Sequence, residues 1–139
     1  MNVFEVEKLI MLYFEEVWNL GKLDILEDII DPEYVNHSPG TPNPPRGPVG
    51  LRPIIAAMRK AIPDLNYEVL DWVYGDNKVA IRSRMTGTHR EELFGIPPTG
   101  KKIDVMQFQI EHLRNGKIVA HWRQTDDLTM MKQLGLVPA

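Results

Sequence analysis

The stretch Gly116-Lys-Ile-Val-Ala-His-Trp-Arg-Gln-Thr-Asp-Asp-Leu, residues 116–128, predicts a β-strand that ends on a carboxylate. Alternate side chains of a strand point to opposite faces. Alternation gives two sets, which are Ile118, Ala120, Trp122, Gln124 and Asp126 on one face and Lys117, Val119, His121 and Arg123 on the other. The first set begins apolar, so we expect it to face the interior. An acid on the face of Trp122 is then either a satisfied structural group or a proton-transfer group in a pocket.

The hairpin that leads into this strand has two possible registers. A two-residue loop at Asn115-Gly116 pairs Arg114 with Lys117, whereas a three-residue loop pairs Leu113 with Lys117. A one-residue slip moves every side chain to the other face, so burial selects between the two registers.

The three-residue loop places Phe108 and Ile110 on the face of Trp122, which joins the two apolar sets. We therefore predict the bulged, three-residue hairpin. The other face of this part of the sheet is then expected to be outer and polar, with the residues His121, Arg123, Gln107, Gln109 and Glu111.

Length and composition predict one globular domain over residues 1–139. Its 19 acidic and 16 basic residues give a net charge of −3, and the lack of a basic run argues against nucleic-acid or anionic-membrane partners. The chain has no cysteine, and its N-terminus carries acids where a signal peptide needs positive charge. We expect a cytoplasmic protein.

The order of the predicted elements indicates an α+β domain. Helical periodicity covers residues 3–19, 23–30 and 50–62, with a loop rich in proline and glycine at 34–48. Strand patterns follow at 67–74, 78–89, 103–113 and in the closing strand, and a short helix at 128–134 ends the chain. Helices first and antiparallel strands afterwards predict helices packed on one face of a curved sheet.

Five motifs recur in the order of a known family. They are Val35-Asn36-His37-Ser38-Pro39, Thr86-Gly87-Thr88-His89, Phe94-Gly95-Ile96-Pro97-Pro98-Thr99-Gly100-Lys101, Gly116-Lys117-Ile118 with Trp122 and Asp126, and Gln133-Leu134-Gly135. Together they resemble the SnoaL-like polyketide cyclase family. The resemblance implies the cone-shaped α+β fold of nuclear transport factor 2, with helices over the concave face of the sheet and a deep apolar cavity. It also implies intramolecular aldol ring closure of a polyketide ester without metal or organic cofactor.

The resemblance places the family's acid/base aspartate on Asp126, its loop histidine on His37, and a second histidine on or near His112. A carboxyl group beside an aromatic wall can act as general acid and base when its pKa is raised. The alternative for Asp126 is a helix cap, because aspartate is a preferred capping residue. Asp127 can fill that position instead, so we predict a catalytic Asp126 and a structural Asp127.

The remaining candidates are predicted to line the pocket. Trp122, Phe108, Ile110 and Met85 can hold a small apolar or aromatic carbonyl ligand, although a packed core is the commoner role of such residues. His37 can instead be a turn residue, and His89 a rim residue facing water. Four histidines without an acid at ligand spacing predict no metal site.

Two rival functions remain. One is an isomerase, dehydratase or epoxide hydrolase of the same fold, for which Arg82 or Arg84 with Asp104 could supply an Asp-Arg-Asp set, although both arginines are expected to point outward. The other is a ligand-binding or dimerisation module without catalysis. Analogy of fold leads us to expect a homodimer or a dimer of dimers, paired through the outer face of the sheet.

Overall fold

The N-terminal helical segment begins at a capping box. In the computed structural model, which describes all 139 residues, α1 (Val3–Met11) continues directly into the π-helix η1 (Leu12–Asn19). The Asn2 side chain accepts from the Glu5 N–H at 2.9 Å, and the Glu5 carboxylate accepts from the Asn2 N–H at 3.2 Å. The helix predicted for residues 3–19 is confirmed, but its second half is wound as a π-helix.

The other predicted helices are also present. The short helices η2 (Leu23–Ile25) and α2 (Leu26–Ile29) follow each other, α3 spans Pro48–Ala61, and α4 spans Asp127–Gln133. Proline stands at the start of α3, where its missing N–H leaves no intrahelical bond unmade. None of the helices is long and apolar enough to cross a membrane.

Five strands form one mixed sheet in the order β1-β5-β4-β3-β2. Their bounds are Ile30–Asn36 for β1, Asn66–Gly75 for β2, Lys78–Thr88 for β3, Lys102–Arg114 for β4 and Lys117–Thr125 for β5. Neighbours are antiparallel except β1, which runs parallel to β5. The sequence missed β1 because Pro32 indicates a break, but an edge strand tolerates proline on its free side.

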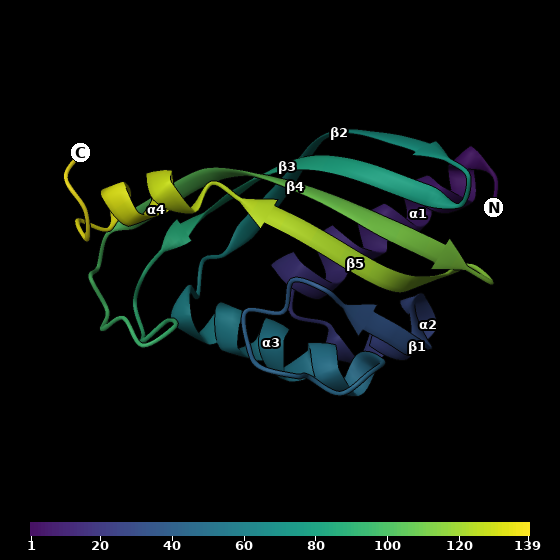
Figure 1. Cartoon of the computed structure of the whole chain (residues 1–139), viewed down its shortest axis with the longest axis horizontal. Coiled ribbons are helices and arrows are strands. Elements are labelled where there is room, and N and C mark those ends of the chain that lie inside the picture. Colours follow the sequence, from purple (N-terminus) through teal and green to yellow (C-terminus); the bar gives the residue numbers. More distant parts are fainter.

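The helices cover only one side of this sheet. Figure 1 shows α1 and α3 against one face, which we call the inner face, and no helix over the opposite, outer face. The hydrophobic core has 26 buried residues, and most of those that belong to strands lie on the inner face, including Val79, Ile81 and Val105. The short helix α4 lies at one end of the sheet, where the side chain of Gln133 bonds both the N–H and the C=O of Asp104.

The last hairpin differs from its predicted register. Arg114 pairs with Lys117 across a two-residue loop, and both Asn115 and Gly116 have positive φ, of 52° and 77°. The prediction of a three-residue loop is therefore wrong. An irregularity occurs instead inside β5, where Leu113 pairs with Ile118 but His112 pairs with Ala120, which leaves Val119 as an extra residue.

Candidate functional site

The extra residue Val119 reverses the faces that regular alternation predicts for β5. Ile118 is buried, but after the bulge it is His121 that is buried, at 1% exposure, while Trp122 is 38% exposed. Phe108 and Ile110 do share a face with Trp122, as predicted, but this face is the outer one, where they are 58% and 44% exposed. The prediction that these three side chains line the interior is wrong.

Four of the five polar residues that we expected on the outer face are instead buried, and the fifth, Arg123, is half-buried and donates to the Ser38 carbonyl at 3.0 Å. Gln107, Gln109 and Glu111 alternate along the inner face of β4, and each is at least 96% buried. His121 pairs with Glu111 across the strands, so its side chain lies on the same face.

The environment predicted for Asp126 is also wrong. Its side chain is exposed and caps α4, accepting from the Thr129 N–H at 3.2 Å and from the Thr129 hydroxyl at 2.7 Å. These bonds hold the pKa of Asp126 below its ordinary value, the opposite of what a general base at neutral pH needs. Asp127, which we assigned to the cap, is the first residue of the helix.

Two of the predicted histidines gather around Trp122 on the outer face. The His37 ring stacks on the indole with centroids 4.3 Å apart and planes 6° apart, and the His112 ring lies at 4.6 Å and 50°. The structure therefore brings His37, His112, Trp122 and Ile110 together, but outside the enclosed core.

The two remaining candidates lie on β3 or at its end. Met85 is buried on the inner face, and its role as a lining residue stays a prediction. His89 is fully buried and does not face water; its Nδ1 lies 3.1 Å from the Thr99 hydroxyl and accepts from the Thr99 N–H at 3.3 Å. His89 is ten residues beyond Val79, the partner of Glu111, or about 30 Å along an extended strand. It thus fastens the 90–100 loop and stands apart from the buried polar set.

The inner face holds one buried acid–base pair. Glu111 Oε1 lies 2.6 Å from Nδ1 of His121 and accepts from the Gln109 amide at 2.6 Å. Both bonds suit an ionised carboxylate, which only accepts hydrogen bonds. With its Nδ1 hydrogen directed at Glu111, a neutral His121 presents Nε2 as an acceptor. Neither this Nε2 nor Glu111 Oε2 has a partner, although both are buried.

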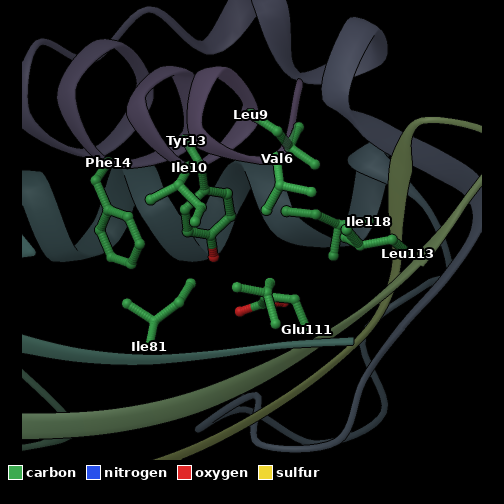
Figure 2. Close-up of a pocket in the computed structure, with 10 residues that line it drawn as sticks. Val6, Leu9, Ile10, Tyr13, Phe14, Ile81, Glu111, Leu113 and Ile118 are labelled. Carbon is green, nitrogen blue, oxygen red and sulfur yellow. The ribbon is translucent and has the colours of Figure 1, made fainter. Parts of the chain in front are cut away.

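Two buried phenols lie near this pair. Burial, and to a smaller extent the charge of Glu111, raises the pKa of both Tyr13 and Tyr34 above the ordinary value, so both remain hydroxyl donors at neutral pH. Figure 2 shows the Tyr13 hydroxyl pointing from the helix toward Ile81 and Glu111. Next to them lies an almost wholly apolar cavity of about 10 Å³, which is room for one water molecule. The deep cavity that we expected is therefore filled by side chains.

A much larger groove lies between the N-terminal helix and β2. Its volume is about 730 Å³, and Ile10 and Phe14 line both the groove and the small cavity beside Glu111. These two side chains therefore form a wall between the groove and the buried pair. The groove is lined by four acids and no basic residue; the acids are Glu7, Glu15, Glu68 and Asp71.

Sequence reasoning missed Glu111 and His121 as functional residues, although a signal was present. Polar residues at every second position of a strand, as in Gln107, Gln109 and Glu111, mark one coherent face. We assigned that face to solvent because it is polar. Only the bulge at Val119 shows that Glu111 and His121 share the interior.

Comparison with known proteins gives a consistent result. The family model described as SnoaL-like polyketide cyclase matches residues 8–134. Aklanonic acid methyl ester cyclase AcmA of Streptomyces galilaeus is 32% identical, over 86% of this chain and 84% of that protein. Aklanonic acid methyl ester cyclase DnrD of Streptomyces peucetius is 29% identical over the same shares.

Solved structures agree over nearly the whole chain. TsrD from Streptomyces laurentii superposes with a TM-score of 0.90 at 26% identity, covering 99% of both chains. IdmH from Streptomyces antibioticus superposes with a TM-score of 0.79 at 33% identity, covering 94% of this chain and 98% of that one.

Proposed function

Because this chain belongs to the SnoaL-like polyketide cyclase family, we propose that it closes a carbon ring in a polyketide ester by intramolecular aldol addition. Two relatives, AcmA and DnrD, carry the name of a cyclase that acts on a methyl ester. The observation on which the proposal depends is the buried Glu111–His121 pair, whose Nε2 atom is free on the inner face.

The pair supplies both proton transfers of an aldol closure. Nε2 of His121 takes the proton from the carbon beside the ester carbonyl, and the electron pair of that C–H bond forms an enolate. The enolate carbon then bonds to a ketone carbon of the same molecule, and the alkoxide that results takes the proton back from Nε2. Glu111 stabilises the imidazolium between these two steps, and the atoms balance without an oxidant or a second reactant.

The groove beside η1 is the route to this pair. Since Ile10 and Phe14 separate the groove from Glu111, a ligand of several rings reaches the pair only when the segment of residues 3–19 moves away from β2. Of the four acids along the groove, Asp71 is paired with Arg82, and the other three disfavour a carboxylate relative to an uncharged ester. This favours a methyl ester over its free acid as the substrate.

The test uses aklanonic acid methyl ester and its free acid as substrates. The product is measured by liquid chromatography with detection by mass spectrometry. We expect turnover of the ester only, and a decrease in kcat of about 10²- to 10⁴-fold for His121→Gln. The matched control is His112→Gln, which changes the same side chain on the outer face and is expected to retain turnover. Full activity of His121→Gln, or loss of activity in the control alone, would contradict the assignment of the inner face.

The two rival functions find different support. The arginines required for an Asp-Arg-Asp set lie outside, as predicted, where Arg82 bonds Asp71 and Arg84 bonds Asp104. Neither of these two arginines therefore reaches the buried Glu111–His121 pair. The homodimer remains a proposal, and one observation favours it: the uncovered outer face is apolar, with Val73 70% and Phe108 58% exposed. We propose that a second copy of this chain covers it, because the charges beside the patch are already paired within one chain and do not repel a second copy.

A further inference from the structure

Tyr34 stands beside the acid–base pair on a strand that the sequence does not reveal. It belongs to β1, where Asn36 is the register partner of His121 on β5. The register of β1 against β5 shifts between Ile30 and Val35, so Tyr34 lies in the irregular stretch two residues before Asn36. Its side chain is buried, and it lies close enough to Glu111 for that charge to raise the pKa of the phenol, after burial and Tyr13. The backbone around it is fixed, since the Tyr34 carbonyl accepts from the Gly47 N–H at 2.9 Å.

The hydroxyl of Tyr34 has no partner although the residue is 98% buried. An unsatisfied buried donor destabilises a folded protein, and native structures rarely retain one without a reason. A phenylalanine would fill nearly the same volume without this cost. The hydroxyl therefore implies a hydrogen-bond acceptor that binds there.

The other unpartnered polar atoms near Tyr34 have the opposite role. Oε2 of Glu111 and Nε2 of a neutral His121 both accept hydrogen bonds. Tyr34 is thus the unpartnered donor in a group of acceptors. Burial also keeps its hydroxyl protonated, because it raises the pKa of the phenol.

We infer that the Tyr34 hydroxyl donates a hydrogen bond to the carbonyl oxygen that becomes negative when His121 removes the neighbouring proton. This assignment rests on the proposed aldol closure and adds the group that stabilises its enolate. A fixed donor in a site that excludes water stabilises a developing oxyanion more than water does, because it needs no reorientation. His121 moves the proton and Tyr34 holds the charge.

The test measures oxyanion binding and does not need turnover. The probes are 4-nitrophenolate, at a pH where it is ionised, and nitrobenzene, which has the same ring without the oxyanion. Binding of the first is followed by its absorbance, and binding of the second by calorimetry. The variant is Tyr34→Phe, and the matched control is Tyr74→Phe, which removes a tyrosine hydroxyl on β2 that bonds the Met1 carbonyl at 3.2 Å.

We expect Tyr34→Phe to weaken 4-nitrophenolate binding by about tenfold to a hundredfold, the range for a hydrogen bond to a charged group. Nitrobenzene binding should stay within about twofold, and Tyr74→Phe should change neither. Equal weakening of both probes would show that Tyr34 only packs, and this outcome, unchanged phenolate binding, or no binding to the wild-type chain would overturn the inference.

The outcome is separable from that of the proposed function. If His121→Gln abolishes ring closure while Tyr34→Phe leaves phenolate binding intact, the aldol proposal stands and the Tyr34 assignment fails. If Tyr34→Phe weakens phenolate binding but the chain closes no ring, the oxyanion site stands and the reaction must be another one that forms an enolate.

Discussion

The two faces of β4 contradict the usual distribution of polar and apolar residues. On the inner face Gln107, Gln109 and Glu111 are nearly fully buried, while on the outer face Phe108 and Ile110 are about half exposed. Burial of polar groups is unfavourable unless they are hydrogen-bonded, and here they bond one another in a chain. This distribution is the reason why we propose chemistry at the inner face and contact with a second copy at the outer face.

The difference between the two faces also bears on the buried polar atoms that have no hydrogen-bond partner. The polar side chains of β4 bond one another along the inner face, but buried atoms without a partner remain on Tyr34, Ser83, His89, Glu111 and His121. Three of these residues, Tyr34, Glu111 and His121, form the group where we propose that a ligand binds.

The largest effect is expected when one inner and one outer side chain of β5 are exchanged. A variant with His121→Trp and Trp122→His keeps the composition but places an indole at a position that is 99% buried, and it removes the His121 partner of the buried Glu111 carboxylate. We expect its free energy of unfolding to fall by about 4 kcal/mol or more, measured by urea denaturation. Trp122→His alone should change it by less than about 1 kcal/mol. Equal stability of the exchanged and wild-type chains would refute the buried role of His121.

A charge on the outer face tests whether that face is covered by a second copy. Phe108→Lys should weaken self-association by at least about thirtyfold, because the ammonium group would be buried without a partner. Light scattering with size-exclusion chromatography measures the mass, and Phe4→Lys, the same change at an exposed position of α1, is the control. A wild-type protein of single-chain mass at micromolar concentration would contradict the dimer.

The smallest effect is expected at Asp126, outside both faces. Asp126→Ala removes the cap of α4 and should lower the melting temperature by a few degrees while ring closure is retained, which calorimetry and the turnover assay check. The folded-state pKa of Asp126 is lowered, so this stabilisation is present above the ordinary aspartate pKa of about 3.8 and is lost as the pH falls below it. Asp127→Ala is the control, and a loss of turnover in Asp126→Ala at unchanged stability would restore Asp126 as a catalytic candidate.

Local signals in the sequence predicted most of the elements correctly. The helix of residues 3–19 and the strands at 67–74 and 78–89 each follow from patterns a few residues long. At Asn115-Gly116 the position of the turn was correct but the predicted loop length was wrong. Strand β1 was not predicted. Its partner β5 is more than eighty residues away, so no local sequence pattern indicates their pairing.

The sequence by itself determined the α+β order of elements, the two apolar sets that share a face, and the family, because these follow from local periodicity and from motifs in a fixed order. Only the tertiary structure decided which face is inside. One extra residue at Val119 reverses the alternation that follows it, and where the sheet accommodates that residue depends on β1, β4 and the helices together. The same contacts brought Glu111, His121 and Tyr34 together from three strands.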